Sequence, residues 1–511
     1  MRMPASRAAF ALASLLLAST AAFVDARAAP ETIEVSPAAD PSQQKVRSAT
    51  DATPPTVPHN VPISIQPGGS PAGLPVGTTP QPYLLSLRSA DAARMGERLA
   101  SDGIYFNLFD NAQYQAVTAG GTSHGSFGTN WFNFGVDLDL QKILGIPGAS
   151  VHFLPTSLSG QGKTWDFNGS AWSGLNNWGV HDGLQLREFT WDQHLFGDRV
   201  LLLGGRTNPT GGEFDGSELY CLFASFICSS PKGFIADASG PAFTTSSWGG
   251  RLVVRPFRNS YVKLGIFEDE PWLRTANHQS WPGEDWGLNL SQGAFMPVEI
   301  GYRTNFATDR HPRTYSLGFT WDTAKYADPF YSTAGRPLAT GGTADTHSGR
   351  GTVYFQAQQA VWRAPGTDLR AIIPFAAGNF STAGYGVLRS NISAGLFIWG
   401  PFARRPRDYF GIVAENFLWN GRNVEAEDER LSRGQVQHQI SGSETMLEIN
   451  YGINFAPGMT FTPYAEYLWH PDQFSASTPK PDLNKAVEIG GLLAINLNQA
   501  LGLPTLPRLR F

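Results

Sequence analysis

Two sets of residues in this sequence have types and spacing that could support chemistry. The first is Gly121-Thr122-Ser123-His124-Gly125, which matches the GxSxG pattern of a serine nucleophile. That pattern needs a strand, a sharp turn and a helix around the serine, whereas here it lies in a glycine-rich stretch between two expected strands. The ten histidines lack the spacing of metal ligands, and there is no HExxH motif and no phosphate-binding or dinucleotide-binding glycine loop. We therefore expect no enzyme, no cofactor and no metal site, although a lipid-active or glycan-active enzyme stays formally open.

The second set consists of polar and charged residues that alternate with apolar ones. In ETMLEINYGINFAPGMTFTPYAEYLWHP (444–471), Leu447 and Ile449 alternate with Glu448 and Asn450, and the pattern resumes after a short turn. Successive side chains of a strand project to opposite sides, so such a strand has one apolar and one polar face. In a soluble sandwich the apolar face is the core, whereas in an outer-membrane barrel it meets lipid and the polar face lines a wet lumen.

The whole chain has to decide between these two readings. With 511 residues it could form several domains or one large barrel. Charged residues make up 16% of the chain and the net charge is −5, which gives no reason to expect nucleic acid or an anionic membrane surface as a partner.

The N-terminus predicts export. Arg2 and Arg7 precede the apolar run 8–24, and Ala26-Arg27-Ala28 supplies the small residues of a cleavage site, so residues 1–28 are predicted to be a signal peptide. No other segment approaches the roughly 18 apolar residues that a membrane-spanning helix requires. The exported chain is therefore expected to be either soluble outside the cytoplasm or a barrel in an outer membrane.

Two short regions separate the signal peptide from the first strand. Residues 29–82 are rich in Pro, Ser, Thr and Ala, and are predicted to be a periplasmic linker because they cannot bury enough apolar surface to fold. Residues 83–103 are predicted to contain a short amphipathic helix that is capped by Ser89 and stopped by Gly103. Its apolar face would consist of Ala92, Met95 and Leu99.

About 16 strands are predicted within residues 104–511. They start near Ile104, Trp131, Gly148, Leu184, Arg199, Ser247, Ser260, Met296, Arg313, Arg350, Asp368, Arg389, Asp408, Glu444, Thr460 and Ala486. Every second connection is expected to be short, roughly 3 to 8 residues, and the others to run from roughly 11 to 40. Placing every long loop at one end is typical of an outer-membrane barrel, which has short periplasmic turns and long extracellular loops.

The predicted outer faces agree with an all-β transmembrane antiparallel barrel. Apolar bands of membrane-spanning length recur opposite polar ones, in the sets Phe132, Phe134, Val136, Leu138, Leu140; Tyr315, Leu317, Phe319, Trp321; and Val487, Ile489, Leu493, Ile495, Leu497. Closure of the barrel would pair every backbone group. Residues 187–191 break parity with Leu184 and Leu186, which predicts a bulge.

Four blocks of the sequence form an ordered set: FGVDLDLQKILGIPGASVHFLPTSLSGQG, LREFTWDQHLFGDRVLLLGGRTNPTGGEF, LYCLFASFICSSPKG and ETMLEINYGINFAPGMTFTPYAEYLWHP. Together they resemble the carbohydrate-selective porins of the OprB family. The resemblance covers nearly everything after Gly103. It implies a barrel of about 16 strands in the outer membrane of a Gram-negative bacterium, through which sugars diffuse, with a short helix near the periplasmic mouth. It allows a monomer or a homotrimer.

The C-terminus departs from that family, whose members usually finish on the last strand with an aromatic residue. Here NQALGLPTLPRLRF continues past Leu497 through Pro504 and Pro507 to Phe511. The prolines predict that this tail is not in register with the final strand.

The only two cysteines are Cys221 and Cys228. An exported chain meets an oxidising compartment, where such a pair would close a short loop as a disulfide. Two unrelated small apolar residues are the alternative, and the family resemblance places the pair in an extracellular loop.

Strand parity places two groups of charges on the inner face. Arg206, Arg251, Arg255, Lys263 and Arg303, with Glu299 among them, fall in the fifth to eighth strands, and Glu415, Glu448, Glu466, Glu488, Asp137 and Asp139 fall in the last four strands and the second. In a closed barrel these arcs would face each other and set a field across the bore. Simple solvation of a wet wall is the alternative role for each charge.

Such a lumen suits sugars, whose hydroxyls donate to carboxylates and accept from guanidinium groups. Trp faces can stack on a pyranose, and the candidates in long loops are Trp165, Trp172, Trp178, Trp272, Trp281 and Trp286. An interfacial girdle or loop packing is the alternative for each of them. We expect a passive channel for mono- or small oligosaccharides; the alternatives are a porin for polyols or sugar acids and, from another class, a secreted β-sandwich lectin or glycan hydrolase.

Overall fold

The computed structural model describes most of the chain after residue 82. The described ranges are 83–160, 166–171, 183–209, 214, 219–225, 246–269, 287–288, 290, 292–306, 309–365, 370–433, 440–474, 479–480 and 482–506. The long strands are β1 (Ile104–Gly120), β2 (Gly125–Asp139), β3 (Ala149–Ser159), β4 (Gly183–Leu195), β5 (Val200–Thr207), β6 (Ser247–Val254), β7 (Ser260–Glu268), β8 (Ala294–Arg303), β9 (Arg313–Ser332), β10 (Ala344–Gln359), β12 (Ala371–Ser381), β13 (Leu388–Trp399), β14 (Tyr409–Trp419), β15 (Ser443–Ala456), β16 (Met459–Trp469) and β17 (Lys485–Asn496). Each strand expected from the alternation is present, and the two-residue β11 (Trp362–Arg363) is added between β10 and β12.

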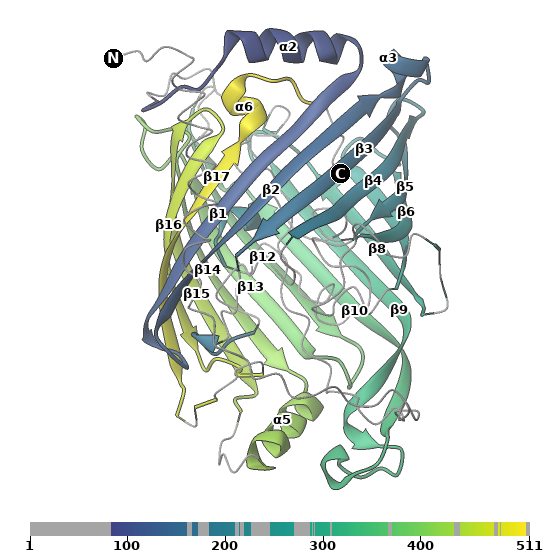
Figure 1. The fold of residues 1–511 in the computed structure, drawn as a ribbon, viewed down its shortest axis with the longest axis vertical. Coiled ribbons are helices and arrows are strands. Elements are labelled where there is room, and N and C mark those ends of the chain that lie inside the picture. The colour runs from purple at the N-terminus through teal and green to yellow at the C-terminus, as the bar shows by residue number, and fades with distance from the viewer. Residues whose placement is uncertain are drawn as a thin grey trace, which may run out of the picture.

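The strands form one closed antiparallel sheet (Figure 1). Neighbours along the chain pair with each other, and β17 returns to pair with β1, where Gln113 lies opposite Leu492. This pairing leaves no open edge at the seam between the first and last strands. The predicted β-barrel is confirmed, and a two-sheet sandwich is excluded.

The outer face of the barrel is apolar, as the alternation predicted. In β9, Leu317 and Phe319 are 52% and 40% exposed, whereas Thr320 is 3% exposed. In β15, Ile449 is 45% exposed and Glu448 is fully buried. Apolar side chains on the outside with buried polar ones behind them are the reverse of a soluble protein and match a lipid-facing wall.

The bulge predicted in β4 is confirmed. Leu154 of β3 pairs with Glu188 while Pro155 pairs with Leu186, so Arg187 has no partner in the ladder. The extra residue shifts the parity of the strand at this point.

The two ends of the barrel differ. The helices α2 (Ala90–Ser101), α3 (Leu140–Leu144) and α6 (Leu497–Leu501) lie at the upper end in Figure 1, where the turns 196–199 and 457–458 are short. Helix α5 (Gly421–Arg433) lies at the opposite end, which also carries η6 (Leu338–Thr340) and the longer connections, such as 160–182 and 420–442. The predicted alternation of loop lengths holds for most connections. It is wrong for 121–124, because β1 and β2 run further than their alternation suggested, and for 382–387, which is also short. It is wrong in the other direction for 360–370, which is longer than the predicted short connections and contains β11.

Helix α2 begins where it was predicted to begin, since the Ser89 hydroxyl accepts a hydrogen bond from the N–H of Ala92 at 3.2 Å. The predicted packing face is wrong, however, because Met95 is 51% exposed. The buried face is instead the small one that contains Ala93 and Gly96. A Cβ on Gly96 would lie 2.8 Å from Leu503, so the absence of a side chain there permits close contact with the C-terminal tail.

The tail leaves the sheet after β17, as its prolines predicted. It forms α6, turns at Gly502 with φ +80° and returns to α2. This return covers Ile495 and Leu497, which were predicted to face lipid but are 5% and 6% exposed. Parity places residues on the outer side of a strand, but it cannot show that a later helix covers them.

Among the described residues no helix is long and apolar enough to cross a membrane.

Candidate functional site: the inner wall of the barrel

The inner face carries most of the charges that strand parity predicted. Arg206, Lys263 and Glu299 lie in β5, β7 and β8, and Asp137, Glu415, Glu448, Glu466 and Glu488 lie in β2 and β14 to β17, all with at most 4% exposure. In the order of the ring these two groups occupy roughly opposite arcs. Arg251 in β6 and Arg303 at the end of β8 are only half-buried, so of the predicted charges within these strands they are the more accessible to a solute.

Two predicted lumen charges belong to turns. Asp139 is the N-cap of α3, and its Oδ1 accepts a hydrogen bond from the N–H of Gln141 at 3.0 Å. Arg255 directly follows β6, and its Nη2 donates to the carbonyl oxygen of Arg258 at 3.2 Å. Each stands at the last position of its strand or just beyond it, where the charge stabilises the turn.

A buried polar group joins β7, β8 and β10. Nζ of Lys263 lies 3.0 Å from Oε1 of Glu299. The Tyr354 hydroxyl lies 3.0 Å from Oε2 of Glu299 and 3.1 Å from the carbonyl oxygen of Phe214. Phe214 belongs to the connection between β5 and β6, so this connection reaches the inner wall here.

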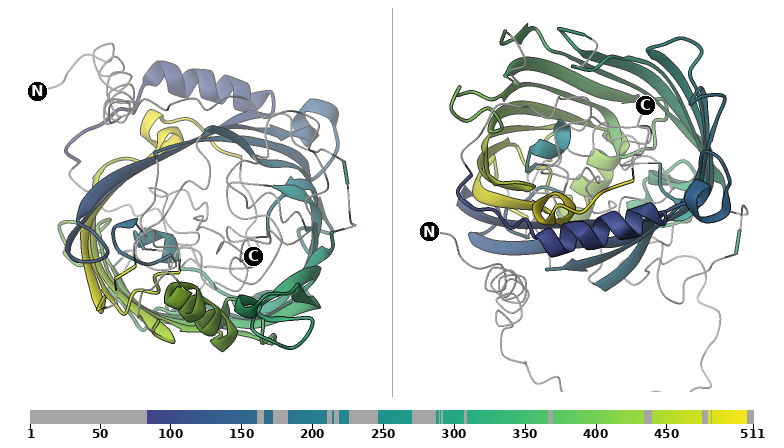
Figure 2. Two further views of the ribbon diagram at one scale, coloured as in Figure 1. Left: turned by 60° about the horizontal axis from the view of Figure 1, so that its bottom comes forward. Right: turned by 90° about the horizontal axis from the view of Figure 1, so that it is seen from above.

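The same connection reaches the wall again at residues 219–225, which we call the lumen strap. The strap includes η3 (Tyr220–Leu222), which Figure 2 shows in teal inside the ring of strands. The carbonyl oxygen of Leu222 accepts hydrogen bonds from the Tyr409 hydroxyl at 3.2 Å and from Nδ2 of Asn450 at 3.1 Å. Nε2 of Gln113 in β1 donates to the carbonyl oxygen of Ala224 at 3.1 Å.

Apolar packing completes the seat of the strap. Tyr220 and Phe223 are at most 1% exposed and their rings contact Phe375 with centroid distances of 5.2 and 5.7 Å. The wall beneath them includes Phe397 and Trp399, which point inward from β13. Apolar residues on both faces of β12 to β14 are the sequence signal that a loop covers this part of the inner wall.

Three glutamates lie side by side on the opposite side of the lumen from Lys263. Glu448, Glu466 and Glu488 are direct cross-strand partners in β15, β16 and β17. Gln115 of β1 donates to Glu488, and its Oε1 accepts a hydrogen bond from the Tyr464 hydroxyl at 2.7 Å. The carboxylate of Glu448 contacts the strap, because its Oε1 and Oε2 accept hydrogen bonds from the backbone N–H groups of residues 224 and 225 at 2.9 and 2.7 Å.

Asp137 is also paired within the wall. Its Oδ1 lies 2.8 Å from Nδ1 of His152, and Nε2 of that ring lies 2.9 Å from the Ser150 hydroxyl. Arg187, which the parity argument left open because of the bulge, lies with its guanidinium 5.7 Å from the ring of the inward-facing Trp131. This half-buried arginine adds a cation to the inner wall beside Trp131 that sequence reasoning missed.

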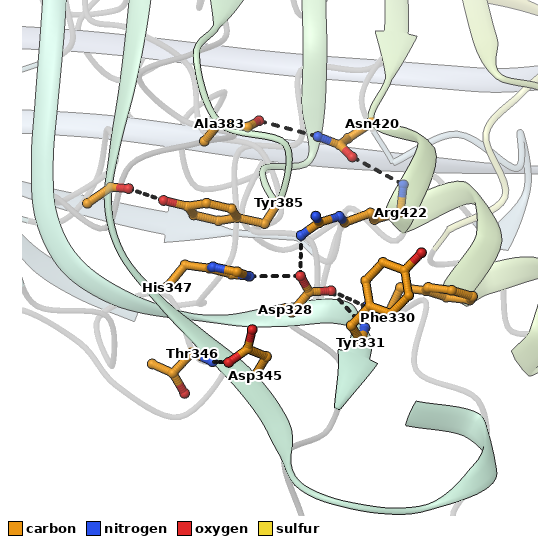
Figure 3. Close-up of polar contacts among 11 residues, drawn as sticks. Asp328, Phe330, Tyr331, Asp345, Thr346, His347, Ala383, Tyr385, Asn420 and Arg422 are labelled. Atoms are coloured by element: carbon orange, nitrogen blue, oxygen red, sulfur yellow. Dashed lines mark hydrogen bonds and ion pairs between the residues drawn. The ribbon is translucent and has the colours of Figure 1, made fainter. Parts of the chain in front are cut away.

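A second polar cluster, also missed, ties α5 to the extended end of β9 and β10 (Figure 3). Asp328 is 1% exposed, and its Oδ1 accepts a hydrogen bond from the N–H of Tyr331 at 2.8 Å. Its Oδ2 lies 2.8 Å from Nε2 of His347 and also binds the guanidinium of Arg422 in α5. The His347 ring stacks on Tyr385 with centroids 4.2 Å apart. One buried carboxylate thus holds α5 at the mouth of the barrel.

Two further loops meet at a buried acid pair near the same mouth. The N–H of Asp472 donates to Oε2 of Glu444 at 2.6 Å, and the Ser170 hydroxyl donates to Oε1 of the same glutamate at 2.7 Å. The N–H of Ala171 donates to Oδ2 of Asp472 at 2.9 Å. Burial raises the pKa of Asp472 to about 6.

The remaining predictions have mixed outcomes. The GxSxG stretch connects β1 to β2, and the hydroxyls of Thr122 and Ser123 donate to a backbone carbonyl, so the strand-turn-helix setting is absent there. Cys221 is held in a disulfide. Within the described part of the chain, no group of three or more His, Cys, Asp or Glu is arranged to hold a metal ion. Cys228, residues 1–82 and the candidates Trp165, Trp172, Trp178, Trp272, Trp281 and Trp286 lie outside the described residues.

Comparison with known proteins agrees with this architecture. The profile of the family described as carbohydrate-selective porin, OprB family, matches residues 126–493. Porin B of Pseudomonas aeruginosa is 25% identical over 365 residues, which cover 67% of this chain and 77% of that protein. The putative porin QuiX of Acinetobacter baylyi is 21% identical over 296 residues, which cover 55% of this chain and 63% of that protein.

The fold comparison points the same way. The high-pH structure of Pseudomonas putida OprB superimposes with a TM-score of 0.69 at 23% identity, covering 78% of this chain and 95% of that one. Together with the family match over most of the barrel, the closed sheet with its apolar exterior and charged interior leads to one assignment. This chain belongs to the OprB family of carbohydrate-selective porins, outer-membrane channels for the diffusion of carbohydrates.

Proposed function

We propose that this porin passes neutral mono- and small oligosaccharides by passive diffusion, without a catalytic step. The observation that carries the proposal is the accessible basic side of the lumen. Arg187 and Arg251 are half-buried on the inner wall, and Arg303 is half-buried at the end of β8, whereas the acidic residues on the other side are buried. Guanidinium groups offer several fixed donors to vicinal hydroxyls, and a solute held weakly by such groups can also leave.

The buried charges then have a supporting role in the proposal. Glu299 is engaged by Lys263, and Glu448 by the lumen strap, so these groups fix the shape of the wall against which a sugar slides. A sugar acid is the second candidate solute, and it is favoured by the same half-buried arginines because they would attract its carboxylate.

Liposome swelling with the purified, refolded porin tests this function. We expect neutral monosaccharides to enter faster than disaccharides, and both to enter faster than they enter protein-free liposomes. Faster entry of a sugar acid than of a neutral sugar of equal size would assign the channel to the second candidate. Neutral sugar entry no faster than the lipid background, with the barrel folded, would overturn the proposal.

We also propose the layout of the rest of the chain. Residues 1–28 are removed on export, 29–82 form a periplasmic linker, and the barrel assembles as a monomer or a homotrimer. The N-terminal sequence of the mature protein and its mass in detergent distinguish these outcomes.

A further inference from the structure

We infer that Glu448 is a positioning residue, which anchors the lumen strap to the inner wall and thereby sets the bore of the channel. The inference rests on the proposed function, because the bore matters only in a channel. Strand parity suggested that Glu448 contacts sugar. We infer instead that its role is to hold a loop.

Both carboxylate oxygens of Glu448 are engaged by consecutive residues of the strap. Oε1 accepts from the N–H of Ala224 at 2.9 Å and Oε2 accepts from the N–H of Ser225 at 2.7 Å. Two successive backbone N–H groups directed at one anion form a concave donor site. Such bonds to a charged acceptor are roughly twice as strong as neutral ones. Glu448 is fully buried, so a sugar has no access to this carboxylate while the strap is docked.

Asn450 makes Glu448 part of a larger clamp. Its Nδ2 lies 2.7 Å from Oε1 of Glu448 and 3.1 Å from the carbonyl oxygen of Leu222. Glu448 and Asn450, at successive inward positions of β15, therefore bind two backbone N–H donors and one carbonyl acceptor of the strap. The other polar contacts described for the strap, from Tyr409 and Gln113, are bonds between neutral groups.

Phe214 and the lumen strap, both described parts of the connection between β5 and β6, contact different sides of the barrel. Phe214 of the same connection is fixed on the side of β7 and β10, where it packs on Phe267 with centroids 6.1 Å apart. The strap is fixed on the side of β14 to β16 and β1. Release of the strap end would leave the connection held at Phe214 and would open the space beside Glu448.

The test is E448Q in planar bilayers, because glutamine has nearly the same shape but directs an amide donor at one of the two strap N–H groups. We expect the ratio of channels in a state of higher KCl conductance to channels in the normal state to rise roughly tenfold or more. A tenfold change corresponds to about 1.4 kcal/mol, and a hydrogen bond to a charged group contributes at least that much. Liposome swelling should then admit oligosaccharides that the unmodified porin excludes. Unchanged or lower conductance in a folded E448Q barrel would overturn the inference.

Two further variants make the result specific. D408N neutralises a carboxylate that is also buried but stands in the turn between β13 and β14, where it pairs with Arg405 at 2.8 Å. It should alter stability without raising conductance. If E448Q does not fold, the double variant Y409F/N450A removes both donors to Leu222 and should raise conductance in the same direction. Because KCl conductance needs no sugar, failure of this inference is distinguishable from failure of sugar transport.

Discussion

The ammonium group of Lys263 lies 3.0 Å from a carboxylate oxygen of Glu299, and the two side chains are 3% and 2% exposed. A buried ion pair that loses one partner leaves an uncompensated charge, which costs about 3–5 kcal/mol. We therefore expect K263M to lower the free energy of unfolding by that amount, measured by urea unfolding of the porin in lipid or detergent. The double variant K263M/E299Q should recover much of the loss because it removes both charges. Equal instability of the single and double variants would contradict this account.

Arg251 lies within β6 and Arg255 directly follows its last residue, so their alanine variants form a matched pair that compares a cation of the wall with a cation of the turn. R251A removes a half-buried cation from the inner wall, so ion selectivity in planar bilayers should shift toward cations. R255A removes a cation from a turn and should leave selectivity near that of the unmodified porin. A larger effect of R255A would mean that the turn, rather than the wall, controls the ions.

Asp472 predicts a pH dependence of stability. Burial raises its folded-state pKa from 3.8 to about 6, so the folded protein binds the proton more tightly than the unfolded chain does. The free energy of unfolding should then fall as pH rises from about 4 to about 6, by on the order of 3 kcal/mol from this group. D472N should flatten this slope, whereas D482N, at an exposed position of the same loop, should not. Retention of the full slope in D472N would assign it to other groups.

Arg422 binds the buried carboxylate of Asp328 and thereby ties α5 to β9. R422A should make local opening of α5 easier by about 1–3 kcal/mol, because the carboxylate loses a charged donor. Hydrogen exchange followed by mass spectrometry should show faster exchange in residues 421–433 with an unchanged barrel. R430A is the control, since Arg430 pairs with Glu427 inside the same helix and is exposed to solvent. Equal acceleration by both variants would show that α5 is held by other contacts.

Cys221 is disulfide-bonded, and we predict Cys228 as its partner. The unreduced protein, unfolded in denaturant so that both cysteines are accessible, should therefore react with a thiol reagent only after a reductant is added. Labelling of unreduced protein at either cysteine would refute the pairing.

The amino-acid sequence by itself determined the strands and their faces. Alternation such as that around Ile449 and Glu448 is a local property, because each residue of a strand points opposite to its neighbours wherever the strand lies. It also determined the start of α2 at Ser89, since a cap needs only the next few residues. The bulge at Arg187 could be found from the same break in parity.

The tertiary structure alone decided what covers each face. Glu448 and Arg251 have the same inward parity, yet one is buried beneath the lumen strap and the other is half-buried on the wall. Ile495 points outward like Ile449 but is covered by α6. The contact between Arg422 and Asp328 joins residues that are far apart in the sequence. Such contacts depend on where loops return after the barrel closes, and no periodicity within a strand carries that information.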